Sequence, residues 1–279
     1  MSILNNLFSS YSTGKNCKYE NSNNSFFLIA GPCIIESKQE TLDIAKKLDD
    51  ITNKHSIPLV FKGSFKKANR TRIDSFTGIG DESAISILKE VKETLKIPIT
   101  TDVHTIKDIE KVSNIADIIQ IPAFLSRQTD LVVQAAKKGK YINIKKGQFM
   151  SAESMKYTAE KAKASGNSNI MLTERGSMFG YNDLIVDFRN ISLMKKYGYP
   201  VVLDVTHSLQ KPNQSSGVTG GQPEMIETIA RAGIAVGSDG IFLETHLNPS
   251  NSKSDAENML NINKVEDLLI KLKGIKGSI

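Results

Sequence analysis

The chain alternates between short apolar runs and longer segments in which apolar residues recur at helical spacing. Eight apolar runs end in polar or charged residues, and they span Phe26–Cys33, Leu59–Phe65, Ile97–Val103, Ile118–Ala123, Tyr141–Gln148, Asn169–Arg175, Val201–His207 and Gly240–His246. Runs of this length, bounded by polar residues, are typical of buried β-strands. We therefore predict eight strands.

The segments between these runs have the pattern of amphipathic helices. Ser37 and Glu40 form a capping box, and Thr105 with Asp108 repeats this arrangement further along the chain. Apolar stripes at helical spacing occur at Leu42, Ala45, Leu48 and Ile51; Ala84, Leu88, Val91 and Leu95; Leu131, Val132, Ala135 and Ala136; Met155, Ala159 and Ala162; Met225, Ile226, Ile229 and Ala230; and Val265, Leu268, Leu269 and Leu272.

Strands that alternate with helices predict parallel pairing through right-handed crossovers. Eight such units favour a closed (β/α)8 TIM barrel, an α/β fold, and no change of composition marks a second domain. An open doubly wound sheet is the alternative, but no GxGxxG turn follows the first run. We expect one barrel domain over residues 26–279, preceded by a polar N-terminal extension over residues 1–25 with a short local hairpin.

Composition excludes several functional classes. The chain has 279 residues, 39% of them hydrophobic and 24% charged, with a net charge of +6. A positive balance suits anionic ligands. The lysines are scattered over the helical segments without interleaved aromatic residues, so we expect no nucleic-acid partner.

Cysteine usage and the distribution of apolar residues bear on the cellular location of the protein. The two cysteines, Cys17 and Cys33, form no CxxC pair, which indicates a reducing, cytoplasmic environment. No apolar run approaches the ~18 residues that cross a membrane. The N-terminus is rich in Ser and Asn and lacks a basic start followed by an apolar core, so we do not expect a signal peptide or a membrane partner.

Positive charge gathers at the ends of three predicted strands. Active sites of barrels lie at the C-terminal ends of the strands, and Lys62, Lys67, Lys145 and Arg175 all fall there. Period-two alternation puts Lys145 on the inward face beside Asn143. A lysine inside a barrel requires a compensating anion. The pattern predicts a cage for phosphate or carboxylate; a solvated basic loop and separate structural ion pairs are the alternatives.

A second group has the donor types of a metal site. Cys33, His207 and Glu244 lie at the ends of neighbouring strands of a closed barrel, and Asp255 follows the last strand. Thiolate, imidazole and carboxylate are ligands of borderline divalent metals such as Zn²⁺, Fe²⁺ or Mn²⁺. Core packing of a single buried cysteine is the alternative.

Together these strand ends resemble the 3-deoxy-D-manno-octulosonate 8-phosphate synthase (KDO-8-phosphate synthase) family in colinear order over residues 26–272. The motifs that carry the resemblance are Ala30-Gly31-Pro32-Cys33-x-x-Glu36-Ser37, Phe61-Lys62-x-Ser64-Phe65-x-Lys67-Ala68-Asn69-Arg70, Gln120-Ile121-Pro122-Ala123-Phe124-Leu125-x-Arg127-Gln128-Thr129-Asp130, Asn143-x-Lys145-Lys146-Gly147-Gln148-Phe149, Thr173-Glu174-Arg175-Gly176, Phe179-Gly180-Tyr181-Asn182, Asp204-x-Thr206-His207-Ser208 and Glu244-Thr245-His246. So many motifs in one order are far more specific than any one of them.

The resemblance implies condensation of phosphoenolpyruvate with D-arabinose 5-phosphate and water, a step in the synthesis of the lipopolysaccharide precursor. It implies that phosphoenolpyruvate is held by Lys62, Ser64, Lys67, Gln120, Lys145 and Arg175. It further implies that arabinose 5-phosphate is held by Asn69, Arg70, Thr71 and, from a neighbouring subunit of a homotetramer, Arg127. On this basis we expect the catalytic residues to be Lys145, His207, Cys33 and Asn69.

The family has a metal-dependent branch, and in its metal-free branch Asn replaces the Cys. The presence of Cys33, His207, Glu244 and Asp255 implies the metal-dependent branch, with Zn, Fe, Mn or Co as the divalent ion. The chain departs from the family at Thr71-Arg72, where Ser-Ser is usual, although Thr71 keeps a hydroxyl group. The loop over residues 211–221 also diverges.

Three other functions stay open. 3-Deoxy-D-arabino-heptulosonate 7-phosphate synthase uses erythrose 4-phosphate and typically has Lys-Pro-Arg-Thr where this chain has Lys67-Ala68-Asn69-Arg70, so Asn69 favours the longer sugar. A Schiff-base aldolase would use Lys145 without phosphoenolpyruvate. A non-catalytic sugar-phosphate binding protein would keep the barrel but release no phosphate.

Overall fold

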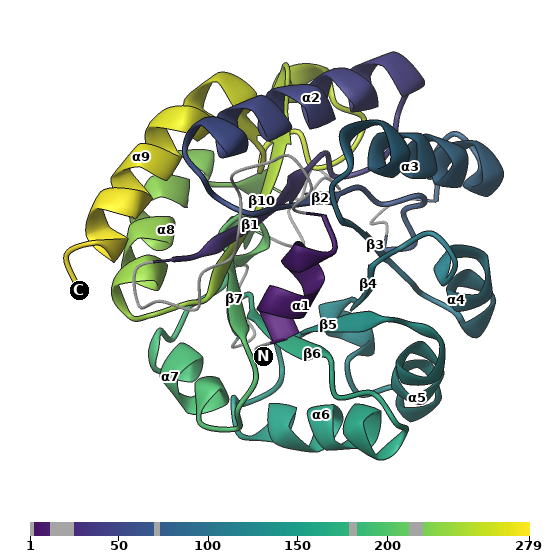
Figure 1. The fold of residues 1–279 in the computed structure, drawn as a ribbon, viewed down its shortest axis with the longest axis vertical. Coiled ribbons are helices and arrows are strands. Elements are labelled where there is room, and N and C mark those ends of the chain that lie inside the picture. The colour runs from purple at the N-terminus through teal and green to yellow at the C-terminus, as the bar shows by residue number, and fades with distance from the viewer. Residues whose placement is uncertain (1–2, 12–24, 70–72, 179–182, 212–219) are drawn as a thin grey trace.

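Eight parallel strands form a closed barrel in the computed structural model, which describes residues 3–11, 25–69, 73–178, 183–211 and 220–279 (Figure 1). The barrel strands are β1 (Phe27–Gly31), β2 (Leu59–Lys62), β3 (Ile99–Asp102), β4 (Ile118–Ile121), β5 (Tyr141–Lys145), β6 (Ile170–Glu174), β7 (Val201–Asp204) and β10 (Gly240–His246). Each pairs with the next, and β10 pairs back onto β1 with Phe27 opposite Gly240. The prediction of a TIM barrel is confirmed.

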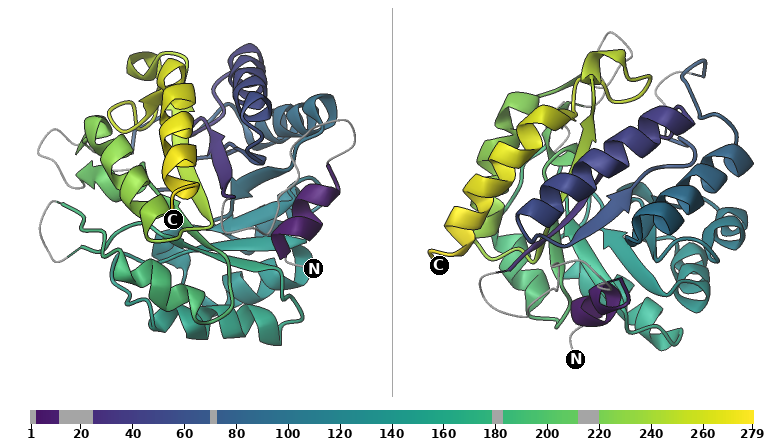
Figure 2. Two further views of the ribbon diagram at one scale, coloured as in Figure 1. Left: turned by 60° about the vertical axis from the view of Figure 1, so that its left-hand side comes forward. Right: turned by 45° about the horizontal axis from the view of Figure 1, so that its top comes forward.

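Helices surround the barrel, and Figure 2 shows this outer layer from two further directions. They are α2 (Lys38–Lys54), α3 (Asp81–Leu95), α4 (Ile106–Val112), α5 (Thr129–Lys138), α6 (Ser154–Ala164), α7 (Arg189–Lys195), α8 (Ile226–Ala235) and α9 (Val265–Lys276). Thr105 and Asp108 form the reciprocal capping box of α4, as predicted. Of the box predicted for α2, the structure shows the Ser37 half, in which the Ser37 side chain accepts from the backbone N–H of Glu40. Helix α7 was not predicted, because it has only 7 residues and buries only Ile191 and Met194 as apolar residues.

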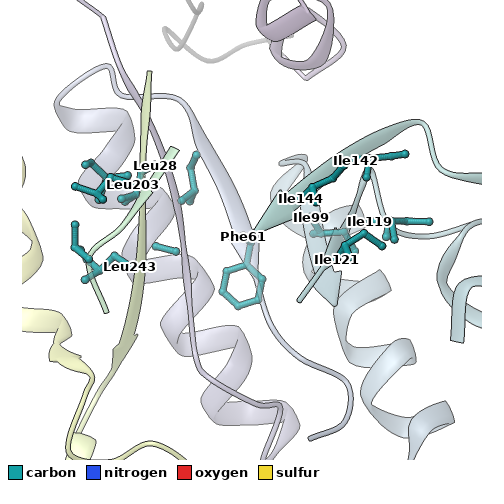
Figure 3. Close-up of a cluster of buried hydrophobic side chains, with 14 of the residues drawn as sticks. Leu28, Phe61, Ile99, Ile119, Ile121, Ile142, Ile144, Leu203 and Leu243 are labelled. Atoms are coloured by element: carbon teal, nitrogen blue, oxygen red, sulfur yellow. The ribbon is translucent and has the colours of Figure 1, made fainter. Parts of the chain in front are cut away.

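The outward face of the strands makes the main hydrophobic core with the helices. Figure 3 shows part of this cluster, in which Leu28, Phe61 and Ile144 come from three different strands. The inward face alternates with it, as period-two geometry requires. Ile142 and Ile144 therefore lie in the outer core, while Lys145 faces the barrel interior.

The N-terminal end of the barrel interior is apolar and is covered by a helix. The expected local hairpin is wrong for residues 3–9, which form α1 (Ile3–Ser9) across the middle of the ring in Figure 1. Leu4, Leu7 and Phe8 have the spacing of one helical face. They pack on the inward side chains Phe27, Ile29, Val60, Ile118, Met171, Val202 and Phe242.

A polar contact fixes the end of this segment. The Tyr11 hydroxyl donates to Asp117 Oδ1 at 2.6 Å, and Lys92 Nζ donates to the same oxygen at 2.8 Å. The remainder of the expected extension, residues 12–24, lies outside the described residues. Three further short strands lie outside the barrel: β8 (Gln210–Lys211) pairs with β9 (Gly220–Gly221), and β11 (Leu260–Asn261) pairs in parallel with the end of β10. None of the described helices is long and apolar enough to cross a membrane.

Candidate active site

A cavity opens at the C-terminal end of the barrel, opposite α1. Side chains from the ends of most strands line it, namely Cys33, Lys62, Ser64, Lys67, Asn69, Asp102, Gln120, Pro122, Ala123, Phe124, Lys145, Arg175, His207, Gln210 and Glu244. The structure thus brings the cations Lys62, Lys67, Lys145 and Arg175 to one place. Such a concave site with converging charged groups is the usual form of an active site in this fold.

Each of the three lysines has its own carboxylate. Lys62 Nζ lies 2.6 Å from Glu244 Oε1, and Lys67 Nζ lies 2.5 Å from Asp255 Oδ2. Burial alone would lower the pKa of Lys62 and of Lys67, but the nearby carboxylates outweigh it and raise both. Both lysines therefore stay cationic, and the pairing makes their burial tolerable before any ligand binds.

Lys145 is held in a different way. Its Nζ donates to Asp204 Oδ2 at 2.6 Å and lies 3.6 Å from the centre of the Phe242 ring, which forms the floor beneath it. Burial lowers the pKa of Lys145 despite the attraction of Asp204. The ring face and the carboxylate both favour a cation at this point.

Asp204 connects Lys145 with His207. Its Oδ2 also contacts His207 Nδ1 at 2.8 Å, while Oδ1 accepts the backbone N–H groups of Thr206 and His207. Burial opposes ionisation of Asp204, but His207 and Lys145 more than compensate and lower its pKa. The position of Asp204 at the exit of β7 thus sets the orientation of two site residues.

Arg175 is the cation with the least compensation among the described cavity residues. Its Nη2 donates to Gln210 Oε1 at 2.9 Å, whereas the buried Nη1 has no hydrogen-bond partner in the described part of the chain. Burial lowers the pKa of Arg175, although the side chain still stays charged. A buried guanidinium with an unused donor is suited to an anionic ligand.

Cys33, Glu244 and Asp255 form the candidate metal group. One donor atom from each lies within 4.8 Å of the others, and His207 Nε2 lies 3.4 Å from Glu244 Oε1. The second oxygen of Glu244, Oε2, is buried and lacks a hydrogen-bond partner among the residues described. Sulfur, carboxylate and adjacent imidazole donors with an unused buried oxygen fit a borderline divalent ion.

The thiol of Cys33 is part of a hydrogen-bonded cluster. It donates to Asp255 Oδ2 at 3.1 Å and accepts from Lys67 Nζ at 3.0 Å. Burial raises the pKa of Cys33, and the carboxylates of Asp255 and Glu244 raise it further. Asp255 has a backbone φ of 50°, in the left-handed region that aspartate tolerates better than most residues.

The remaining predicted residues divide into three groups. Ser64, Gln120 and Asn69 line the cavity; Ser64 donates to Asp102 at 2.5 Å, and Gln120 Oε1 is buried without a partner among the described atoms. Arg127 does not line this cavity but a separate surface hollow with Phe149, Met150, Ser154, Tyr157, Thr158 and Lys161. Arg70 and Thr71 lie outside the described residues.

Sequence reasoning assigned no role to several residues that the structure places in or under the cavity. Asp102 and Asp204 end predicted strands, so their inward position was a usable signal. Gln210 and Phe242 gave no such signal: Gln210 lies in the short strand β8, outside the eight predicted strands, and Phe242 is an ordinary apolar residue of β10.

A protein-family model described as the DAHP synthetase I family matches residues 15–279. The chain belongs to the DAHP synthetase I family. Among the curated relatives of this chain, the 2-dehydro-3-deoxyphosphooctonate aldolase of Geotalea uraniireducens is 50% identical to it. The alignment covers 89% of this chain and 91% of the relative. The 2-dehydro-3-deoxyphosphooctonate aldolase 2 of Arabidopsis thaliana is 51% identical over 90% of this chain and 88% of its own.

A third relative, the 2-dehydro-3-deoxyphosphooctonate aldolase of Nitrosococcus oceani, is 46% identical over 91% of this chain and 90% of its own. The name of these relatives is an alternative to 3-deoxy-D-manno-octulosonate 8-phosphate synthase, the enzyme that the strand-end motifs resemble. Membership of the DAHP synthetase I family and the barrel architecture therefore agree with the resemblance found in the sequence.

Proposed function

We propose that this protein is a 3-deoxy-D-manno-octulosonate 8-phosphate synthase. It joins phosphoenolpyruvate to D-arabinose 5-phosphate with addition of water and releases inorganic phosphate, a step in the synthesis of the lipopolysaccharide precursor. The single observation that carries the proposal is the meeting of Lys62, Lys67, Lys145 and Arg175 in one cavity beside a cysteine–carboxylate group. Relatives about half identical over nearly the whole chain, with this activity in their names, support it.

The cations offset the repulsion between two phosphorylated substrates. Two like unit charges about 4 Å apart repel by about 4 kcal/mol at an effective dielectric constant near 20. Lys62, Lys67, Lys145 and Arg175 hold the phosphate and carboxylate of phosphoenolpyruvate, together with the polar side chains of Ser64 and Gln120. The unused donor of Arg175 supports this assignment, because a bound anion would satisfy it.

The reaction forms one carbon–carbon bond. The enol carbon C3 of phosphoenolpyruvate attacks the aldehyde carbon of the sugar, water adds at C2, and phosphate leaves with cleavage of the C–O bond. Lys145, which lines the cavity and is paired with Asp204, stabilises negative charge as it develops. Asp204 keeps both Lys145 and His207 oriented while this happens.

We assign a divalent metal ion to Cys33, His207, Glu244 and Asp255. Such an ion, Zn²⁺, Fe²⁺, Mn²⁺ or Co²⁺, would supply Lewis-acid polarisation of the aldehyde or of a water molecule. The close approach of three of these donors and the neighbouring position of His207 support the assignment. His207 Nδ1 is already bound by Asp204, which leaves Nε2 directed toward Glu244.

The sugar phosphate is held at the mouth of the cavity by Asn69, Arg70 and Thr71 and by Arg127 of a neighbouring subunit in a homotetramer. Asn69 lines the cavity, while Arg127 lies at a separate hollow of the same chain. The position of Arg127 outside the cavity of its own subunit supports the proposal that it binds the sugar phosphate in the cavity of a neighbouring subunit.

The family description also covers the heptulosonate activity, so the choice of sugar is the point to test. Phosphate release from phosphoenolpyruvate is measured with arabinose 5-phosphate, erythrose 4-phosphate and N-acetylmannosamine in parallel. We expect release only with arabinose 5-phosphate. Faster release with erythrose 4-phosphate would replace the proposal with 3-deoxy-D-arabino-heptulosonate 7-phosphate synthase, and no release with any aldehyde would favour a binding protein.

A further inference from the structure

Lys146 is a buried lysine that does not reach the cavity. It follows Lys145 at the end of β5, and the strand alternation turns its side chain away from the barrel interior. Its exposed fraction is nevertheless 0%, and burial lowers its pKa against the attraction of Glu174. A fully buried ammonium group is costly, so its contacts are informative.

The Lys146 ammonium connects the loops that follow β5 and β6. Its Nζ donates to Ser177 Oγ at 3.0 Å and to the carbonyl oxygens of Gly147, Met150 and Gly176 at 3.3 to 3.4 Å. It also lies 3.4 Å from Glu174 Oε1. Three of these five partners are backbone carbonyl groups, and a fourth is the Ser177 hydroxyl. The contacts therefore hold the main chain of the two loops in place.

Glu174 fixes the same turn from the other side. Its Oε1 accepts the backbone N–H groups of Arg175 at 2.9 Å and of Gly176 at 2.7 Å, and its Oε2 accepts from Asn190 Nδ2 of α7 at 2.9 Å. Gly176 adopts a φ of 85°, in the left-handed region that favours glycine, so the chain bends sharply here. Glu174 thus holds the turn after β6 through the backbone of two consecutive residues, Arg175 and Gly176.

The residue carried by this turn is Arg175. Its guanidinium is the cavity cation without a paired carboxylate within the described residues, and Gln210 is its one hydrogen-bond partner there. Lys62, Lys67 and Lys145 are positioned by carboxylates, whereas Arg175 is positioned, within the described residues, by the Gln210 contact and by the course of its own backbone. The alignment of a bidentate cation with an anion is sensitive to displacements of about 1 Å.

We propose that Lys146 and Glu174 are positioning residues for the phosphoenolpyruvate half of the reaction, acting through Arg175. The inference rests on the proposed function, because it takes phosphoenolpyruvate as the anion that Arg175 binds. It concerns neither the metal group nor the sugar end of the cavity, since the contacts of Lys146 and Glu174 stop at the loops after β5 and β6 and at α7.

The test compares Lys146→Met with Lys92→Met. Lys92 is also paired with a carboxylate, Asp117, but at the opposite end of the barrel, so its loss reports destabilisation alone. We expect Lys146→Met to raise the KM for phosphoenolpyruvate about tenfold or more while the KM for arabinose 5-phosphate stays within about twofold. Lys92→Met lowers Tm and leaves both KM values within about twofold. Equal changes in the two KM values of Lys146→Met would overturn the inference.

A double-mutant cycle shows whether the effect passes through Arg175. In an Arg175→Ala background, Lys146→Met should change phosphoenolpyruvate binding, measured by calorimetry without the sugar, by less than about twofold. Full additivity of the two substitutions would contradict the inference. Glu174→Gln, which keeps the shape of the side chain, provides the same comparison if Lys146→Met does not fold. Absence of turnover in the unmodified enzyme would instead reject the proposed function, and the inference with it.

Discussion

The two ends of the barrel are built from the same strands but from opposite kinds of side chain. At the N-terminal end, Phe27, Met171 and Val202 point inward and meet the apolar face of α1. At the C-terminal end, the inward positions two or four residues further along are charged, as Arg175 and Asp204 show. Strand geometry is the same at both ends, so the difference lies wholly in the residue chosen at each inward position.

This contrast separates stability from function within one fold. Apolar burial at the N-terminal end contributes to the free energy of unfolding, at roughly 25 cal/mol per Å² removed from water. Buried charges at the C-terminal end give little net stability, because pairing such as Lys62 with Glu244 mainly offsets the desolvation of both groups. Substitutions at the charged end should therefore change kinetics, and those at the apolar end should change stability.

Metal removal should produce the largest loss of activity. This loss should arise at the charged, C-terminal end of the barrel and should leave the apolar end unaffected. Exhaustive chelation is expected to abolish turnover, and added Mn²⁺, Fe²⁺ or Co²⁺ to restore it, because Cys33, Glu244 and Asp255 are positioned to share an ion. Turnover and bound metal are measured together, and Cys33→Ala should retain less metal than the unmodified protein. Full activity after complete removal of the metal would show that the assignment is wrong.

Lys145→Ala should cause the second-largest loss of activity. Removal of this cavity cation leaves Asp204 facing developing negative charge, and we expect kcat/KM for phosphoenolpyruvate to fall about 10³-fold. Steady-state kinetics give the value, and thermal unfolding shows that the variant is folded. Lys156→Ala, at an exposed position on α6, is the matched control. An unchanged kcat/KM in Lys145→Ala would remove this lysine from the site.

Asp204→Asn should have a smaller effect of the same kind. The substitution keeps the shape of the side chain but removes the charge that orients Lys145 and His207, so kcat should fall about 10- to 100-fold. The comparison with Lys145→Ala is made under identical conditions. A larger loss in Asp204→Asn than in Lys145→Ala would mean that the carboxylate itself takes part in the chemistry.

Leu7→Ala should change stability without changing kinetics. Leu7 is buried in α1 against the apolar end of the barrel, and its truncation should cost about 2 to 5 kcal/mol of unfolding free energy. Urea denaturation measures this cost, and Ile270→Ala on the exposed face of α9 is the control. The kcat/KM should stay within about twofold. A large kinetic effect of Leu7→Ala would contradict the separation of the two ends.

Much of the fold was predictable, because apolar periodicity decides it. The eight strands and most helices follow from residue spacing, and Ser37 and Thr105 cap helices where expected. Helix α1 was not predicted, because a segment rich in Ser and Asn masks three apolar residues whose partners are distant in sequence. Tertiary burial, which local sequence does not encode, stabilises it.

The candidate site was predictable at the level of residues but not of contacts. Strand ends predicted that Lys62, Lys145 and Arg175 converge, and all three line the cavity. Which carboxylate pairs with which lysine depends on loop conformation, as the contact between Lys67 and Asp255 shows, and no spacing rule gives it. The role of Lys146 likewise emerges only when the loops after β5 and β6 are placed side by side.

The fate of the bridging oxygen of phosphoenolpyruvate tests the central claim most directly. The unmodified enzyme is given arabinose 5-phosphate and phosphoenolpyruvate labelled with ¹⁸O at the bridge between C2 and phosphorus, and both products are analysed by mass spectrometry. The account predicts one eight-carbon sugar acid phosphate per phosphate released, with the label in the inorganic phosphate. Phosphate release without the eight-carbon product, or label retained in the sugar acid, would contradict it.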